Sequence, residues 1–173
     1  MSSIPYDLSR IKAIIFDVDG VLSKNVIGMS ENGEPLRTVN IKDGYALQLA
    51  VKKGYLLAII TGAYTDAVRM RFERLGLQHI YMKSAVKMAD YEDFVVKTNL
   101  RDEEIAYVGD DIPDYEVMKR AGLAIAPADA APEIKAIAHY VSPINGGEGV
   151  AREIIEQVMK VQGTWMADGA FGW

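Results

Sequence analysis

The sequence predicts an α/β fold: a Rossmann-like, doubly wound parallel sheet held between two layers of helices. Short apolar runs alternate along the chain with longer segments that have the 3.6-residue period of a helix. Strands that alternate with helices form βαβ units, whose right-handed crossovers place helices on both faces of a parallel sheet. Glycine or polar residues follow several of the apolar runs directly, as they do where parallel strands end at a ligand site.

The first expected strand, at 13–16, leads straight into Asp17-Val18-Asp19-Gly20. Four apolar residues that end at polar residues and a glycine are typical of a buried strand. Further strands are expected at 56–60, 105–108, 123–126 and 140–141, with a short one near Tyr81. Helices are expected at about 44–53, 65–75, 86–98, 114–120, 132–138 and 150–161.

The segment between the first strand and the first helix breaks this alternation. It contains Asn32-Gly33, a dipeptide that favours a hairpin turn, between two extended-type stretches. We therefore expect a β-hairpin at about 24–39 that projects from the sheet directly after the aspartate pair. Its place beside the site favours a flap over a plain connection.

Composition and charge narrow the class of protein. The 173 residues predict one domain at 1–162, followed by a tail at 163–173. The net charge of −5 argues against a nucleic-acid partner, and the absence of cysteine excludes disulfides and thiolate metal sites. The N-terminal residues lack an apolar signal region, and no apolar run reaches about 18 residues. We expect a cytoplasmic enzyme with no membrane partner.

Polar side chains are expected to meet at the carboxyl edge of the sheet. The candidates are Asp17 and Asp19 after the first strand, Thr61-Gly62 after the second, Asp110, Asp111 and Asp114 after the fourth, and Lys87 at a helix start. Parallel strands end at one edge, so residues far apart in the sequence converge there. Each motif alone is weak, but their order and their positions at strand ends together indicate one site.

These side chains suit the metal-assisted hydrolysis of a phosphate ester. A carboxylate nucleophile divides that reaction into two steps through an aspartyl-phosphate. A cation held by carboxylates lets the anionic nucleophile approach an anionic phosphate. A lysine and a hydroxyl neutralise the transferring oxygens, and a second carboxylic acid protonates the leaving group and then activates water.

The same residues resemble the four motifs of the haloacid dehalogenase superfamily of phosphatases. The motifs are Asp17-Val18-Asp19-Gly20-Val21, Thr61-Gly62, Lys87 and Gly109-Asp110-Asp111-Ile112-Pro113-Asp114. The resemblance covers about 11–161. It implies that Asp17 is the nucleophile, Asp19 the general acid and base, and Thr61 and Lys87 the phosphate binders. It also implies Mg²⁺ held by the Asp17 carboxylate, the Asp19 backbone carbonyl and Asp110, with Asp111 and Asp114 supporting these ligands.

The spacing of the motifs leaves no room for a cap domain. Only the hairpin and one helix separate Asp17 from Thr61, and only a helix and a short strand separate Gly62 from Lys87. The chain therefore resembles the capless members of the superfamily. An open site needs something else to close over a small substrate, and a neighbouring subunit is the natural candidate.

Within that subfamily the chain resembles the 3-deoxy-D-manno-octulosonate 8-phosphate phosphatases. The matching segments are Asn32-Gly33-Glu34, Asn40-Ile41-Lys42-Asp43-Gly44-Tyr45, Ala106-Tyr107-Val108-Gly109-Asp110-Asp111 and Gly146-Gly147-Glu148-Gly149. The resemblance implies a homotetramer that hydrolyses an eight-carbon sugar-acid phosphate of lipopolysaccharide synthesis. It also implies a substrate pocket that includes Asn40, Ile41, Lys42, Asp43 and Gly44.

Three departures keep other substrates open. Ala63, Gln48 and Glu148 stand where such phosphatases often carry arginines. The alternatives are a phosphatase for a nine-carbon 2-keto-3-deoxy sugar acid 9-phosphate, a broad sugar-phosphate phosphatase, and a non-catalytic phosphatase-like oligomeric module. Phosphoaspartate receiver domains share the fold type, but their phosphorylated aspartate normally follows the third strand.

Arg71 and the tail each have two interpretations. Arg71 lies near the apolar face of its helix, where it either binds a substrate carboxylate or packs its stem on the helix flank. The tail carries Trp165, Met166, Phe171 and Trp173, an amount of aromatic surface that calls for a partner. That partner is either its own subunit or the active site of a neighbour.

Overall fold

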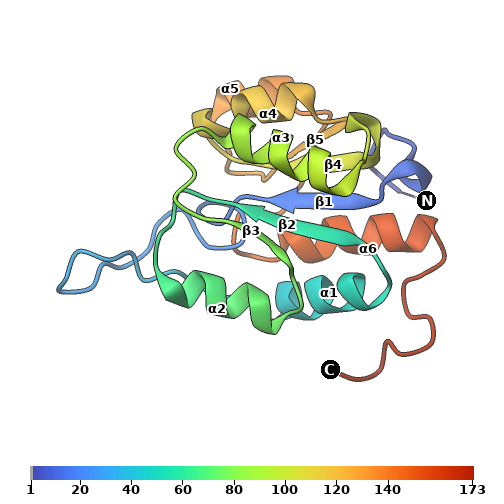
Figure 1. Cartoon of the computed structure of the whole chain (residues 1–173), viewed down its shortest axis with the longest axis horizontal. Helices are drawn as coiled ribbons and strands as arrows, with labels where there is room; N and C mark the ends of the chain where they lie inside the picture. The colour runs from blue at the N-terminus through green and yellow to red at the C-terminus, as the bar shows by residue number, and fades with distance from the viewer. Residues whose placement is uncertain (1) are drawn as a thin grey trace.

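The computed structural model describes residues 2–173 and has three layers, with a sheet between two sets of helices (Figure 1). The sheet has six parallel strands in the order β3-β2-β1-β4-β5-β6. Their bounds are β1 Ala13–Phe16, β2 Leu56–Ile60, β3 His79–Tyr81, β4 Ile105–Val108, β5 Leu123–Ala126 and β6 Tyr140–Val141. The strand order reverses beside β1, which is where a doubly wound sheet binds its ligands.

Helices cover both faces of the sheet (Figure 1). One layer contains α1 Ile41–Lys52, α2 Asp66–Arg74 and α6 Val150–Val161, and the other contains α3 Lys87–Thr98, α4 Tyr115–Arg120 and α5 Pro132–Ile137. Short 3₁₀ turns lie at η1 Leu8–Arg10, η2 Asp102–Glu104 and η3 Ile112–Asp114. The predicted fold class, a doubly wound parallel sheet without a cap domain, is confirmed.

Alternate residues of the strands face the two helical layers. In β1, Ile14 and Phe16 pack towards α1, α2 and α6, whereas Ala13 and Ile15 pack towards α3 and α4. The four central strands β1, β2, β4 and β5 are therefore apolar and buried on both faces, as a parallel sheet requires, whereas the edge strands β3 and β6 are only partly buried. The register pairs Phe16 with Val108 of β4, so the residues that follow β1 and β4 lie side by side.

Helix α1 begins three residues before the predicted start. The side chain of Asn40 accepts hydrogen bonds from the backbone N–H groups of Lys42 (2.9 Å) and Asp43 (3.1 Å). This capping satisfies two of the first N–H groups of the helix, which otherwise lack partners. Residues 41–43 thereby join the helix, and Asp43 becomes part of its buried face.

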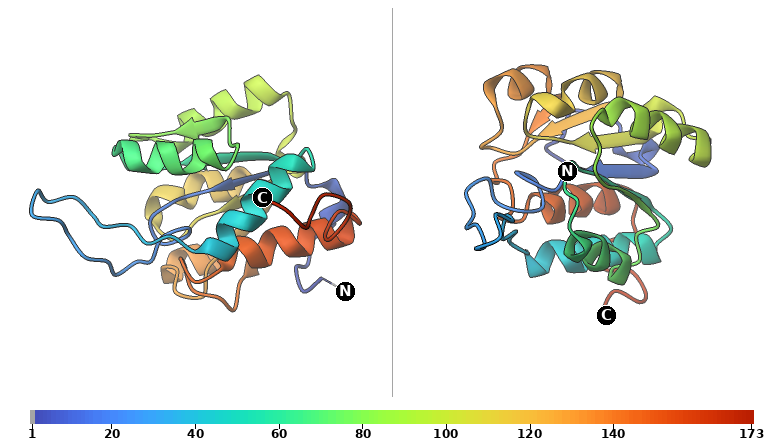
Figure 2. Two further views of the ribbon diagram at one scale, coloured as in Figure 1. Left: turned by 90° about the horizontal axis from the view of Figure 1, so that it is seen from below. Right: turned by 60° about the vertical axis from the view of Figure 1, so that its left-hand side comes forward.

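The segment 24–39, here called the flap, projects from the edge where the strands end (Figures 1 and 2). It reverses direction at Gly33, whose φ of +78° suits glycine, but it does not form two regular strands. Its two sides pair through one antiparallel bridge between Met29 and Pro35. The bonds of this bridge run from the Leu36 N–H to the Gly28 carbonyl (2.9 Å) and from the Ser30 N–H to the Glu34 carbonyl (2.8 Å). The predicted hairpin is thus present as a turn with one antiparallel bridge, without regular strands on either side.

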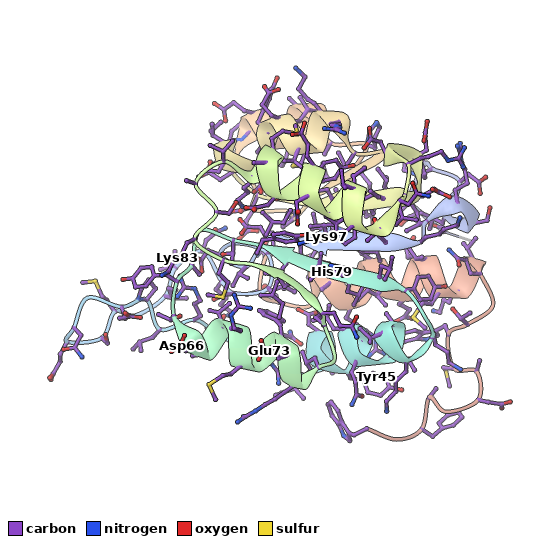
Figure 3. The ribbon with its side chains drawn as sticks, viewed as in Figure 1. Tyr45, Asp66, Glu73, His79, Lys83 and Lys97 are labelled. Carbon is purple, nitrogen blue, oxygen red and sulfur yellow. The ribbon has the colours of Figure 1, made fainter. Side chains whose placement is uncertain are left out.

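The tail packs on its own chain, at the end of the molecule opposite the flap (Figure 2). The guanidinium of Arg152 lies 4.5 Å from the ring centre of Trp165. The rings of Trp173 and of Tyr45 in α1 pack edge to face, with their centres 5.8 Å apart. Tyr45 is labelled in Figure 3. No helix within residues 2–173 has the length and apolar character to span a membrane.

Candidate active site

Asp17 lies at the end of β1, in the interior of the carboxyl edge. Its Oδ1 accepts a hydrogen bond from the backbone N–H of Val18 (2.7 Å). Its Oδ2 lies 2.8 Å from Nζ of Lys87, the first residue of α3. Both side chains are buried, so this ion pair is shielded from solvent.

Asp114 is the best-bonded carboxylate of the site. Its Oδ1 accepts from Nζ of Lys87 and from the hydroxyl of Tyr107, both at 2.7 Å. Its Oδ2 accepts from the backbone N–H of Asp110 (3.0 Å). The side chain has no exposed surface, and it joins β4, η3 and α3 at one point. Asp114 therefore fixes the ammonium group that faces Asp17.

Asp110 completes a group of three carboxylates. One oxygen each of Asp17, Asp110 and Asp114 lies within 4.8 Å of the others. Gly20 makes this approach possible, because a side chain on it would overlap the carboxylate of Asp110. Its φ of +81° also favours glycine.

The charges of this group do not balance. Three carboxylates face one ammonium, which leaves two negative charges in a buried place. Burial, and then the charge of Asp114, raises the pKa of Asp17 to about 7. Burial, and then the charges of Asp17 and Asp114, raises the pKa of Asp110 to about 8. A divalent cation would supply the missing charge, and carboxylate oxygens are ligands that Mg²⁺ prefers.

Lys87 is held in its charged form. Burial lowers the pKa of this ammonium, but the charges and hydrogen bonds of Asp17 and Asp114 outweigh burial and raise it overall. The group therefore remains a cation throughout the neutral range. A fixed cation beside a nucleophilic carboxylate can neutralise oxygens as a phosphoryl group transfers.

Asp19 is not a member of the three-carboxylate group, and its side chain pairs with an arginine. Its Oδ1 lies 2.8 Å from Nε of Arg37, and its Oδ2 lies 3.0 Å from Nη2 of the same guanidinium. Arg37 belongs to the flap. Sequence patterns did not single it out, because nothing in its spacing indicates that the flap root folds back onto residue 19.

Thr61 follows β2 and is buried, and its Oγ1 accepts from the backbone N–H of Ala63 (3.1 Å). Gly62 is exposed beside it. The backbone N–H of Ser84 donates to the Thr61 carbonyl (3.0 Å), which ties this strand end to the loop that precedes Lys87. Asp111 is exposed, and its side chain caps η3.

A cavity of about 380 Å³ lies between the flap root, α1 and α2. Most of its lining is apolar, and the predicted pocket residues Asn40, Asp43, Gly44 and Arg71 also line it. Arg71 approaches Gly44 so closely that a side chain there would overlap its guanidinium. Ile41 and Lys42 are exposed and lie outside the lining.

Asp43 is a buried carboxylate with only one of its two oxygens hydrogen-bonded. Its Oδ1 accepts from the backbone N–H of Arg152 at the start of α6 (2.7 Å), but its buried Oδ2 has no hydrogen-bond partner within residues 2–173. Burial raises the pKa of this carboxyl to about 6. The cavity wall therefore holds an acceptor without a donor, which a ligand hydroxyl would satisfy.

Asp43→Asn is expected to change how stability depends on pH. The folded-state pKa of Asp43 lies above its ordinary value, so the folded chain binds more protons and loses stability as pH rises from about 4 to about 6. Asp43→Asn has no carboxyl group at this position and should not lose this stability. Between about pH 4 and about pH 6, the free energy of unfolding of the variant minus that of the wild type should therefore rise by on the order of 2 kcal/mol. Urea unfolding from pH 4.5 to 7.5 measures it, and parallel pH curves would contradict it.

Comparisons with known proteins identify the family of the chain. A family model described as haloacid dehalogenase-like hydrolase matches residues 76–154. The 3-deoxy-D-manno-octulosonate 8-phosphate phosphatase KdsC of Escherichia coli (strain K12) is 40% identical over 154 residues, which are 89% of this chain and 82% of that protein.

Solved structures show the same likeness. The crystal structure of 3-deoxy-D-manno-octulosonate 8-phosphate phosphatase from Moraxella catarrhalis, in complex with magnesium ion, phosphate ion and KDO, is 31% identical, with a TM-score of 0.86 and 91% of each chain covered. The cobalt-bound deoxy-D-mannose-octulosonate 8-phosphate phosphatase of Haemophilus influenzae is 27% identical, with a TM-score of 0.88. The alignment covers 95% of this chain and 98% of that one. The chain belongs to the haloacid dehalogenase-like hydrolases and is a phosphatase of that family.

Proposed function

We propose that the protein hydrolyses 3-deoxy-D-manno-octulosonate 8-phosphate with the help of Mg²⁺. The observation that carries the chemistry is the buried Asp17, paired with Lys87 inside a group of carboxylates that lacks two positive charges. The observation that carries the substrate is the 40% identity to KdsC over most of both chains.

In the first step Asp17 attacks the phosphorus atom through a carboxylate oxygen. An oxygen–phosphorus bond forms, the bond from phosphorus to the sugar oxygen breaks, and that oxygen takes a proton from the carboxylic acid of Asp19. Lys87 and Thr61 bind the phosphoryl oxygens. Lys87 already bridges Asp17 and Asp114, so little reorganisation is needed as charge develops.

In the second step a water molecule attacks the phosphorus of the aspartyl-phosphate. Asp19, now a carboxylate, accepts the proton of that water. The bond between phosphorus and the Asp17 oxygen breaks, inorganic phosphate leaves, and both aspartates return to their starting forms.

The carboxylates of Asp17 and Asp110 would hold the Mg²⁺, together with the backbone carbonyl of Asp19. When bound, the cation neutralises charge between the phosphate and the nucleophile. Asp114 supports the ligands, because its oxygens are already bonded to Lys87, Tyr107 and backbone N–H groups. Asp111, which caps η3, keeps the turn that carries Asp114 in place.

Mg²⁺ is expected to raise the melting temperature of the wild type and not that of Asp110→Asn. A ligand at about 100 times its Kd stabilises the folded state by about 2.7 kcal/mol, which is roughly 5–10 °C for a chain of this size. Asp66→Asn, an exposed aspartate at the start of α2, is the matched control (Figure 3). An equal rise in Asp110→Asn would show that the ion binds elsewhere.

The substrate is open to one specific alternative. Ala63 is buried, and Glu148 pairs with Lys24 at 3.2 Å. Gln48 of α1 has a buried Oε1 that finds no hydrogen-bond partner in the described part of the chain. None of the three supplies the arginine that similar phosphatases often carry there. A nine-carbon 2-keto-3-deoxy sugar acid 9-phosphate therefore remains the second candidate, with Asn40, Asp43 and Arg71 as pocket residues in either case.

Phosphate release with Mg²⁺ and with EDTA tests the proposal. The substrates are the eight-carbon 8-phosphate, the nine-carbon 9-phosphate and common hexose phosphates. A clear preference for the eight-carbon compound supports the proposal, and a preference for the nine-carbon compound selects the alternative. Absence of metal-dependent turnover on all of them would overturn both and favour a non-catalytic oligomeric module.

We further propose that the protein works as a homotetramer. The flap exposes Val26, Met29 and Leu36, with 90%, 73% and 56% of their surface accessible. Apolar side chains on a projecting loop are suited to contacts between subunits. Analytical ultracentrifugation should show a tetramer for the wild type and smaller species for Met29→Ser. A monomer in both proteins would contradict the proposed tetramer.

A further inference from the structure

The side chain of Asp19 is held by the flap and by nothing else in the described chain. Within residues 2–173, Arg37 is the only residue whose side chain bonds the Asp19 carboxylate. Two parallel bonds of 2.8 and 3.0 Å make a bidentate contact, which fixes the plane of the carboxylate as well as its position. Asp17 and Asp114 are instead fixed by the buried ammonium group of Lys87.

Arg37 itself sits at an anchored part of the flap. The next residue, Thr38, donates its backbone N–H to Oγ of Ser23 (2.9 Å) and accepts at Oγ1 from the backbone N–H of Lys24 (2.9 Å). The Arg37 side chain is only 14% exposed, although the outer flap is open to solvent. The flap root is thus fixed at two adjacent residues, and one of them reaches Asp19.

The contact matters because the side chain of Asp19 is otherwise free. It is 48% exposed, so without the guanidinium it would rotate between several staggered conformers in water. Proton transfer requires a donor or acceptor within hydrogen-bond reach, and a displacement of about 1 Å can cost on the order of 10²-fold in rate. A bidentate partner removes that freedom before substrate arrives.

We propose that Arg37 is a positioning residue for Asp19. It orients the carboxylate for the proton transfers of the hydrolysis, and it couples those steps to the placement of the flap. This role rests on the proposed function, in which Asp19 exchanges protons with the sugar oxygen and with water.

The test is a double-mutant cycle of Arg37→Met and Asp19→Asn with the sugar-acid phosphate. Arg37→Met is expected to lower kcat by about 10- to 100-fold with KM within about twofold of wild type. In the Asp19→Asn background the same change should add no further loss, because Arg37 acts through Asp19. Losses that multiply would overturn the proposal, and so would a raised KM with unchanged kcat, which indicates a direct substrate contact.

p-Nitrophenyl phosphate supplies a readout that a structural role would not give. Its leaving group needs no proton, so the first equivalent of p-nitrophenolate should appear at the wild-type rate in Arg37→Met and in Asp19→Asn. Later turnovers, which need water to be activated, should slow in both. A slowed first equivalent in Arg37→Met would overturn the proposal.

Two further variants serve as controls. Arg37→Lys should recover part of kcat, because an ammonium can contact one of the two oxygens. Arg69→Met removes an exposed arginine of α2 and should leave kcat and melting temperature unchanged. If the wild type turns over the substrate and Asp17→Asn does not, losses that multiply in the double-mutant cycle overturn the positioning role of Arg37 and leave the proposed function standing. Absence of turnover in the wild type counts against the proposed function.

Discussion

Asp17→Asn is expected to lower kcat by at least about 10⁴-fold while the chain stays folded. An amide oxygen is a far weaker nucleophile than a carboxylate, and removal of a covalent nucleophile leaves only binding and electrostatic effects. The fold should tolerate the change because asparagine has nearly the same shape and can keep the bond from Val18 N–H. Initial rates of phosphate release, with the melting temperature, measure both expectations.

Trapping the intermediate makes this test specific. Wild-type protein mixed with substrate and quenched in acid should carry one phosphoryl group, which peptide mass spectrometry would locate on residue 17. The Asp17→Asn protein should carry none, and Asp66→Asn should behave as wild type. A phosphoryl group elsewhere, or turnover that survives in Asp17→Asn, would rule out this aspartate as the nucleophile.

Lys87→Met is expected to be the most destabilising substitution at the site. The lysine lies 2.8 Å from Asp17 and 2.7 Å from Asp114, and its removal leaves the buried carboxylates without an internal cation. Breaking a buried ion pair by removing one partner costs about 3–5 kcal/mol. We expect a loss of about that size at pH 8 without metal, measured by urea unfolding, together with a loss of turnover.

The direction of the pH effect follows from the carboxylates. Burial and mutual repulsion already raise the pKa of Asp17 and Asp110, and removal of the ammonium raises them further. Protonation relieves the repulsion, so the loss of stability should be smaller at pH 6 than at pH 8. Lys12→Met removes an exposed lysine that pairs with a buried carboxylate of Glu104, and it should cost less than about 1 kcal/mol. Equal losses in the two variants would contradict the expectation.

The sheet could be predicted from the sequence because its signals are local. β1, β2, β4 and β5 are short apolar runs that end at a polar residue, a glycine or a proline, and both faces of the sheet are covered by helices. Helix α1 was placed three residues late because its start depends on the side-chain cap from Asn40. The reversal in the flap follows from the Asn32-Gly33 dipeptide, but the extent of pairing on either side of the turn does not, because a turn dipeptide predicts a reversal and not the length of the paired stretches.

The sequence predicts those site residues that belong to a recognisable motif and also lie at or near the end of an expected strand. Asp17, Lys87 and Asp110 converge as expected. The central position of Asp114 was not foreseen, since its bonds to Lys87 and Tyr107 arise from three-dimensional packing. Its position in the first turn after Gly109-Asp110-Asp111 was the available signal. The contact of Arg37 with Asp19 depends on the path of an irregular loop, for which the sequence has no periodic pattern.

Both tryptophans of the chain lie in the tail, and this gives the protein a built-in optical probe. Trp165 stacks against Arg152, whereas Trp173 is 69% exposed beside Tyr45. The indole emission of the whole protein therefore originates from its last nine residues. Any spectral shift that accompanies substrate, metal or subunit association reports the environment of the tail alone, without a label and without interference from the sheet.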